Sequence, residues 1–279
     1  MIYARTTLLL ATAVAAVAAA APATAQTASP VRPDAVVTLA RLACGTPGAP
    51  SDVGRFSDTY KFTGLKVQLT YSCYLVRHGD DYMVWDTGFA PGAGPTAPKT
   101  SLADLVAQTG VKPEQVKYVA VSHYHGDHVG QLAEFPQSTL LIGKGDWDIV
   151  SDPKAAATLG APFAHWVSGG GKVDPVSADR DVFGDGTVVM LDMPGHTPGH
   201  HSLLVRLKGM GPVLISGDVS HFHENYDADG VPTFNTNRAS SLASLARFKD
   251  IAANLHATVI IQHDARDVGK LPAFPEAAK

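Results

Sequence analysis

The chain of 279 residues carries 22 basic and 26 acidic side chains, which leaves a net charge of −4. It has no block of basic residues that could hold a polyanion, so nucleic acid and anionic membrane surfaces are poor partners for it. Its length and its 45% of hydrophobic residues are enough for one large domain with a substantial core.

The first 25 residues have the pattern of a bacterial secretory leader. Arg5 supplies the positive start, residues 8–21 form an apolar stretch, and Ala23-Thr24-Ala25 is a small-x-small cleavage site. The apolar stretch is short for a membrane span, and an uncleaved anchor is the alternative. We therefore expect an exported, periplasmic protein, cleaved near Ala25, with one domain over residues 26–279 and no membrane contact after cleavage.

Residues 26–58 are rich in Pro, Ala and Gly, and we expect them to form an arm over the surface. In an oxidising compartment the two cysteines, Cys44 and Cys73, could form a disulfide that closes a loop of about thirty residues. Two independent buried thiols are the alternative.

Apolar periodicity and turn residues predict the secondary structure in chain order. Strands are expected at residues 66–77, 82–86, 116–121, 139–143, 187–193, 202–207, 213–216 and 257–261. Helices are expected at residues 101–109, 129–135 and 240–255, the last with Asn237 as its N-cap. Residues 144–186 are less informative, and we assign their large aromatic side chains to the core.

The stretch His123-Tyr124-His125-Gly126-Asp127-His128 follows the apolar run of residues 116–121. Side chains two positions apart on an extended chain point the same way, so His123 and His125 could bind one metal ion while Asp127 and His128 reach a second. Imidazole nitrogen and carboxylate oxygen without thiolate suit zinc, with iron, manganese or cobalt as alternatives. A chance cluster of surface histidines is the competing explanation.

Five predicted strands end in a polar residue that suits a metal site: Asp86, His123, His196, Asp218 and His263. Several such endings together indicate strands that converge on one edge of a sheet system. Asp86 is expected either to accept a hydrogen bond from a ligating histidine or to form the turn ahead of Gly88.

These motifs, in this order, resemble the metallo-β-lactamase fold superfamily: Asp86-Thr87-Gly88, the cluster at 123–128, residues 194–200, Gly217-Asp218 and His263. The resemblance implies an α/β fold, an αββα sandwich with two metal ions at one edge. It also implies the ligands: His123, His125 and His196 for the first ion, Asp127, His128 and His263 for the second, and Asp218 as a bridge between them. The β-lactamases of the superfamily lack a bridging carboxylate there, so β-lactamase activity is a weaker expectation.

Within the superfamily, residues 218–225, Val231-Pro232 and the terminal His263-Asp264 resemble N-acyl homoserine lactone lactonases. This resemblance implies that two divalent ions, taken to be Zn²⁺, hold a bridging hydroxide that opens the lactone ring, and that Asp127 passes the proton to the leaving group. The best-known lactonases have a tyrosine three residues after the bridging Asp. His221 stands at that place here, and it is expected either to contact the substrate as a catalytic residue or to be structural. Related enzymes are often dimers, which implies a homodimer.

Other activities would use the same ligands. A broad lactonase, an aryl ester hydrolase or an organophosphate hydrolase needs the same two ions, so a small lactone or ester is the expected substrate class. The leader and the lack of a basic patch argue against phosphodiester hydrolysis. An exported metal-binding protein without activity is the alternative from a different class.

Overall fold

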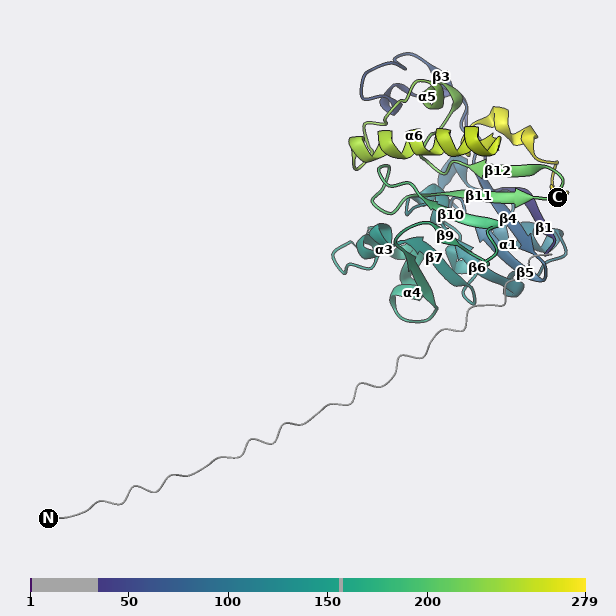
Figure 1. The fold of residues 1–279 in the computed structure, drawn as a ribbon, viewed down its shortest axis with the longest axis vertical. Coiled ribbons are helices and arrows are strands. Elements are labelled where there is room, and N and C mark those ends of the chain that lie inside the picture. The colour runs from purple at the N-terminus through teal and green to yellow at the C-terminus, as the bar shows by residue number, and fades with distance from the viewer. Residues whose placement is uncertain (2–34, 156–157) are drawn as a thin grey trace.

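The computed structural model describes residue 1, residues 35–155 and residues 158–279, so the expected leader lies outside the described residues. The described chain forms two sheets packed face to face, with helices on their outer faces (Figure 1). The first sheet has the strand order β1-β4-β5-β6-β7-β8 and the second has the order β13-β12-β11-β10-β9, while β2 pairs with β3 separately.

The elements have the following bounds. The strands are β1 Val37–Ala43, β2 Ser51–Asp52, β3 Lys66–Val67, β4 Ser72–His78, β5 Asp81–Trp85, β6 Val116–Ala120, β7 Thr139–Gly143, β8 Val173–Val176, β9 Arg180–Asp181, β10 Val188–Asp192, β11 His201–Leu207, β12 Gly211–Ile215 and β13 Thr258–Ile260. The α-helices are α1 Leu102–Gln108, α2 Gly126–Val129, α3 Lys144–Val150, α4 Ala164–Val167, α5 His223–Asp227 and α6 Arg238–Leu255.

The core lies in three layers that follow from the alternation of apolar residues along the strands. Between the sheets, Met83 and Trp85 of β5 pack with Met190 of β10 and Ile215 of β12. The outer face of the first sheet is covered by apolar side chains of α1, and that of the second sheet by Phe248 of α6. This arrangement confirms the expected αββα sandwich.

β1 corrects the expectation of a surface arm over residues 26–58. It pairs antiparallel with β4 along its whole length, and Leu39 and Leu42 are fully buried. Apolar side chains of β1 enter the layers on both sides of the sheet. The prediction of a surface arm is therefore wrong for residues 37–43. A short apolar strand lies there between segments rich in Pro and Gly, whose composition dominated the prediction.

The C-terminal residues tie the two sheets together. Leu39 of β1 and Ala278 exchange two backbone hydrogen bonds of 3.0 and 2.9 Å. The carbonyl of Lys279 accepts the N–H groups of Gly209 and Met210, in the turn between β11 and β12, at 2.9 and 2.8 Å. The last residues of the chain thus join the edge of one sheet to a hairpin of the other.

Two expected elements differ from those observed. The strand expected at residues 66–77 is interrupted between β3 and β4, and the helix expected at residues 129–135 is replaced by the short α2 and a 3₁₀ turn at Leu132–Glu134. α2 ends early because its backbone bonds to another loop: Thr87 N donates to His128 O at 2.6 Å, and Gly130 N donates to Gly88 O at 2.7 Å.

Five strands deliver their C-terminal ends to one edge of the sandwich. β5 runs parallel to β6 in the first sheet, and β12 runs parallel to β13 in the second. β10 points the same way as β12, because both are antiparallel to β11. The loops that follow these five strands therefore collect at the same place.

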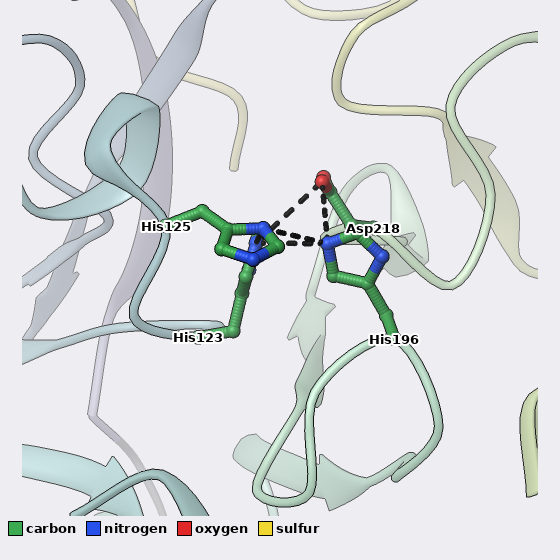
Figure 2. Close-up of side chains that lie close together, drawn as sticks. All are labelled: His123, His125, His196 and Asp218. Carbon is green, nitrogen blue, oxygen red and sulfur yellow. Dashed lines mark hydrogen bonds and ion pairs between the residues drawn. The ribbon is translucent and has the colours of Figure 1, made fainter. Parts of the chain in front are cut away.

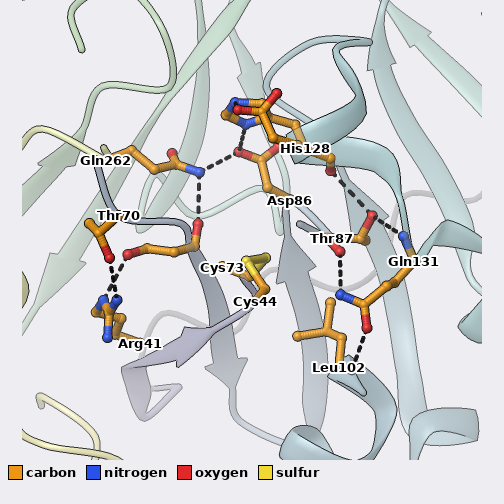
Figure 3. The surroundings of a disulfide bond; sticks show 12 residues. Arg41, Cys44, Thr70, Cys73, Asp86, Thr87, Leu102, His128, Gln131 and Gln262 are labelled. Atoms are coloured by element: carbon orange, nitrogen blue, oxygen red, sulfur yellow. Dashed lines mark hydrogen bonds and ion pairs between the residues drawn. A yellow bond between two sulfur atoms is a disulfide. The ribbon is translucent and has the colours of Figure 1, made fainter. Parts of the chain in front are cut away.

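Cys44 and Cys73 form a disulfide with a Sγ–Sγ distance of 2.08 Å, which confirms the expected pairing (Figure 3). The bond joins the end of β1 to β4 beneath the loop of residues 86–88. Gly88 has a φ of +64°, and a Cβ there would collide with Cys44, so only glycine fits this turn.

Within the described ranges, no helix is long and apolar enough to cross a membrane.

Candidate metal centre

The first group of candidate ligands comes from three loops at the shared edge (Figure 2). His123 Nε2, His125 Nδ1 and His196 Nε2 form a triangle whose sides are 3.0, 3.0 and 3.1 Å. Asp218 Oδ2 lies 3.2 Å from His196 Nε2 and 3.6 Å from His123 Nε2. Three imidazole nitrogens and one carboxylate oxygen thus converge on one point.

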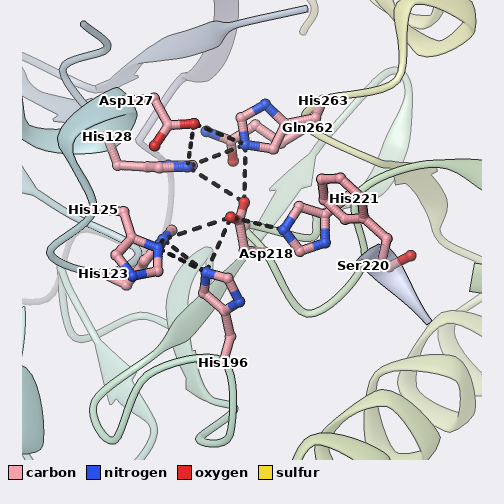
Figure 4. A network of polar contacts seen from close by, with 12 residues as sticks. His123, His125, Asp127, His128, His196, Asp218, Ser220, His221, Gln262 and His263 are labelled. Carbon is pink, nitrogen blue, oxygen red and sulfur yellow. Dashed lines mark hydrogen bonds and ion pairs between the residues drawn. The ribbon is translucent and has the colours of Figure 1, made fainter. Parts of the chain in front are cut away.

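The second group lies beside the first (Figure 4). His128 Nε2 and His263 Nε2 are 3.1 Å apart, and Asp127 Oδ2 lies 3.7 Å from each of them. The other oxygen of Asp218, Oδ1, lies 3.0 Å from His263 Nε2 and 3.3 Å from His128 Nε2. Each oxygen of Asp218 therefore faces one group, which is the position expected for the bridge that the resemblance implies.

The hydrogen bonds on the outer edges of the rings show that these groups fit cations. His196 Nδ1 donates to Asn235 Oδ1 and His263 Nδ1 donates to Thr70 O, both at 2.8 Å. A ring nitrogen that donates to a carbonyl holds the proton there, so Nε2 presents its lone pair to the centre. Lone pairs 3.1 Å apart repel each other unless a cation lies between them, and Asp218 Oδ1 is buried without a hydrogen-bond partner among the described residues.

Asp86 bonds to His128 of the second group on the side away from the other candidate ligands, which is the hydrogen-bond role that was one of its two expected roles (Figure 3). Its Oδ2 accepts hydrogen bonds from His128 Nδ1 at 2.9 Å, Gln262 Nε2 at 2.6 Å and Ser122 Oγ at 3.0 Å. Its Oδ1 accepts Ser122 N at 2.6 Å. Asp86 also sits in the turn before Gly88 with a φ of 58°, so it fills both expected roles.

Two buried residues fix the other loops: His200, which the sequence predicts to be a structural loop histidine, and Asp146, which the sequence did not single out. His200 Nε2 accepts the N–H of Asp218 at 2.8 Å, and its Nδ1 donates to Met193 O at 3.0 Å. Asp146 accepts Thr197 Oγ1 at 2.8 Å and Gly199 N at 2.7 Å. These bonds hold the loops of His196 and Asp218. Asp146 lies in a stretch without a recognisable sequence pattern. The only signal for its role would have been that Thr197 and Gly199, in the loop of His196, need a hydrogen-bond acceptor.

Electrostatics differ between the two groups. Burial, together with the neighbouring His128, holds the pKa of His123 well below its ordinary value, and burial with His196 lowers the pKa of His125 to about 4. Burial would also lower the pKa of His128, but the carboxylates of Asp218, Asp127 and Asp86 raise it. Burial would raise the pKa of Asp218, but the surrounding imidazoles, His221 first, hold it well below its ordinary range. In the first group, imidazoles with lowered pKa values lie beside the carboxylate anion of Asp218, which is a donor set that suits a divalent cation.

His221 lies at the centre but outside both groups. Its Nε2 is 3.0 Å from Asp218 Oδ2, and its Nδ1 is buried without a hydrogen-bond partner among the described residues. The ring packs edge-on against Phe56 at 4.7 Å and lies parallel to His263 at 5.9 Å. Asn225 Oδ1 accepts the His221 N–H at 3.0 Å and so fixes its backbone.

A cavity of about 430 Å³ opens onto the two groups. Its polar floor includes Asp127, Asp218 and His221, and its walls are largely aromatic. Tyr71, which the sequence did not single out, packs edge-on against His263 at 5.6 Å and lines this cavity. Burial and the carboxylates of Asp127 and Asp218 raise the pKa of its phenol. A small ester or lactone could enter here, because the volume is that of an ordinary ligand site.

The sequence model of the metallo-beta-lactamase superfamily matches residues 68–263, which include all seven candidate ligands. The chain belongs to this superfamily. That membership confirms the resemblance on which the predicted ligand set and fold were based.

Among curated members of the metallo-beta-lactamase superfamily, an N-acyl homoserine lactonase of Rhizobium radiobacter is 32% identical over 180 residues, which are 62% of this chain and 67% of the relative. An N-acyl homoserine lactonase of Rhizobium johnstonii is 27% identical over 237 residues and covers 76% of this chain and 89% of the relative.

Two solved structures have the same fold. A quorum-quenching N-acyl homoserine lactone lactonase superposes with a TM-score of 0.71 at 22% identity, over 87% of this chain and 98% of that one. A dizinc quorum-quenching lactonase superposes with a TM-score of 0.65 at 15% identity, over 86% and 89%.

Proposed function

We propose that this protein is a metal-dependent hydrolase that opens the lactone ring of N-acyl homoserine lactones. The observation that carries the proposal is the placement of Asp218, with one oxygen on each ligand group, at the floor of a cavity of about 430 Å³. A single-ion storage site does not need a shared carboxylate beneath an open cavity. The names of the relatives support the choice of lactone within the superfamily.

The seven residues assigned to the two groups would hold the ions: His123, His125, Asp127, His128, His196, Asp218 and His263. Two divalent ions there, which we take to be Zn²⁺ from the donor set and from the dizinc relative, would supply a water of lowered pKa and polarise a carbonyl. The buried hydrogen bonds to Asp86, Asn235 and Thr70 would keep the rings oriented.

Asp127 would transfer the proton of the attacking water, and His221 would contact the substrate. Asp127 is the most exposed of the candidate ligands on the second group, with 26% of its side chain accessible, so its carboxylate can meet a substrate in the cavity. We infer that Asp127 accepts the proton of the attacking water and passes it to the ring oxygen that leaves. His221 would face the substrate carbonyl from the floor of the cavity, with its ring packed against Phe56.

We also infer that the protein is exported to the periplasm, where it would meet small diffusible lactones. The support for this is the leader pattern of residues 1–25, and detection of a mature chain beginning near Gln26 in a periplasmic fraction would test it. We further infer that the protein is a homodimer, as related enzymes often are. Light scattering on the mature protein distinguishes a homodimer from a monomer.

The testing experiment is hydrolysis of a substrate panel by zinc-loaded mature protein whose metal content is measured in the same sample. The panel contains N-acyl homoserine lactones of several chain lengths, an alkyl lactone, an aryl ester, a phosphotriester and a β-lactam. We expect the dominant kcat/KM on the homoserine lactones. A dominant rate on the ester or the phosphotriester would move the function to another hydrolase of the superfamily, and two bound ions without any turnover would contradict hydrolysis altogether.

A further inference from the structure

One charged side chain stands in the wall of the cavity above the candidate metal centre. The wall is otherwise built from apolar and aromatic groups, which include Phe56, Leu69, Phe89 and Phe234, and Arg55 completes it. Binding cavities are mostly apolar, and their few polar groups usually fix the orientation of the ligand. The role of Arg55 therefore bears on what the cavity recognises.

The position of Arg55 is fixed by its backbone and by two rings. It lies in the 3₁₀ turn Gly54–Phe56, and its carbonyl accepts Thr233 N at 2.9 Å and Thr233 Oγ1 at 3.1 Å. Its guanidinium carbon lies 4.8 Å from the ring centre of Phe234 and 5.5 Å from that of Phe56. Stacking on aromatic faces holds a guanidinium in one plane while leaving its N–H groups free at the edge.

The donors of Arg55 are not used by the protein. Among the described residues it is the only arginine whose guanidinium makes no hydrogen bond and no ion pair to another residue. Arg238, Arg247 and Arg266, by contrast, each bind a carboxylate at 2.5–2.7 Å. A guanidinium has five N–H donors in a planar fork, so this one is available to an acceptor oxygen of a bound molecule.

We propose that Arg55 is a specificity residue that donates a hydrogen bond to a carbonyl oxygen on the acyl side of the substrate. This inference rests on the proposed function, which places the lactone ring over Asp218. With the ring on the floor, the acyl chain must leave along the aromatic wall, where Arg55 offers the unpaired donors. The amide carbonyl and, in chains oxidised at the third carbon, the 3-oxo group present the same kind of acceptor.

The test uses two variants and three matched lactones. Arg55→Leu removes the donors and keeps most of the stem, and Arg77→Leu is the control, because Arg77 is exposed on β4 at the opposite edge and donates only to Gly79 O at 2.6 Å. The substrates are N-decanoyl homoserine lactone, its 3-oxo derivative, and a γ-alkyl lactone of similar length that lacks the amide. Metal content is measured for each protein.

We expect Arg55→Leu to raise KM for the N-acyl lactones about tenfold with kcat within about twofold, since the lost hydrogen bond involves a charged donor. The γ-alkyl lactone should be hydrolysed at the wild-type rate, and Arg77→Leu should change nothing. A loss confined to the 3-oxo substrate would assign Arg55 to that carbonyl rather than to the amide.

Two results would overturn the inference while the proposed function stands: an equal loss on all three lactones, which indicates a structural role, or no loss on any of them. A wild-type protein that hydrolyses none of the lactones would overturn the proposed function and the inference with it. Binding of the ring-opened N-decanoyl homoserine, measured by calorimetry, gives a second readout that should weaken about tenfold in Arg55→Leu alone.

Discussion

Gln262 Nε2 donates a hydrogen bond of 2.6 Å to Asp86 Oδ2, and this bond joins the two sheets directly behind the candidate metal centre (Figure 3). Gln262 follows β13 and Asp86 follows β5, so each sheet contributes one partner. The neighbour of Gln262 in sequence is His263, and the same Asp86 oxygen also accepts His128 Nδ1. The two imidazoles of the second group are thus held in relation to each other through one carboxylate oxygen.

Replacing Asp86 with Asn should weaken the second ion selectively. An amide oxygen is a poorer acceptor than a carboxylate, and one of the two positions becomes an NH₂ group that cannot accept from Gln262 or His128. Loss of such a supporting hydrogen bond typically lowers metal affinity 10- to 100-fold. Competition with a chromogenic chelator measures both binding steps. Asp81→Asn, on the same strand but paired with Lys117 on the surface, should leave both unchanged. A weakened first ion with an intact second would contradict this account.

Replacing Asp218 with Ala should abolish the paired site. The variant loses the one carboxylate that faces both groups, so we expect fewer than two ions per chain and a fall in kcat/KM of at least about a hundredfold. Elemental analysis and lactone hydrolysis on the same sample measure the two effects. Asp179→Ala, which removes an exposed partner of Arg247, is the matched control. Full activity with two bound ions in Asp218→Ala would refute the ligand assignment.

Two substitutions of His221 distinguish a catalytic role of this residue from a structural one. His221→Gln keeps a polar side chain of similar reach, and we expect kcat to fall about tenfold or more while both ions remain bound. His221→Phe keeps the packing against Phe56 and should show the same loss. If the glutamine variant is fully active, the residue is structural, and if both variants lose ions, it acts through Asp218 rather than on the substrate.

Removal of the disulfide should cost stability without changing the chemistry. Cys44 and Cys73 are separated by 29 positions, and closing a loop of that length stabilises by about 3 kcal/mol. Urea unfolding of the double variant Cys44→Ala, Cys73→Ala, compared with oxidised wild type, measures the difference. Metal stoichiometry should stay at the wild-type value under native conditions. An unchanged unfolding midpoint would show that the bond adds nothing to the packing around Gly88.

Asp146 should make the stability of the fold depend on pH. Burial raises its pKa to about 6, although the hydrogen bonds from Thr197 and Gly199 lower it in part. A carboxyl group with a raised pKa in the folded state binds a proton more tightly there than in the unfolded chain. Its stabilisation is therefore complete below the unfolded value of 3.8 and is lost as the pH rises through about 6.

In Asp146→Asn this contribution is absent. The free energy of unfolding of wild type minus that of the variant should therefore fall by about 3 kcal/mol between pH 3 and pH 7. Denaturant titrations at several pH values measure this difference. Asp148→Asn, an exposed position on the same helix that pairs with Lys144, should show no such trend. A difference that stays constant with pH would contradict a raised pKa for Asp146.

The sequence was sufficient to predict the parts of this molecule that depend on local pattern. The apolar strands that end at Asp86, His123 and His263 were recognisable because buried strands have continuous apolar runs and the polar residues follow them directly. The cap at Asn237 was also correct, since its side chain accepts Ser240 N at 2.9 Å. These features depend on neighbours within a few residues.

The features that were missed depend on partners far along the chain. β1 was taken for an arm because its strand character appears only when Leu39 and Leu42 find the two layers on either side of the sheet. Asp146 accepts a hydrogen bond from the backbone of Gly199, which lies 53 positions away in sequence. Asn225 donates to the carbonyl of Phe56, 169 positions away, at 3.2 Å. No periodicity records such contacts, so only the assembled fold shows them.

The hydrogen bonds between Leu39 and Ala278 cover the free edge of β1 with a segment from the far end of the described chain. They join the first strand of the described domain to its last residues, and the carbonyl of Lys279 then closes onto the second sheet. A chain made from its N-terminus presents β1 and its partner β4 early and Ala278 late. The edge of β1 that faces Ala278 therefore stays open until residues near 278 are in place, and until then it has to be kept from pairing with other chains.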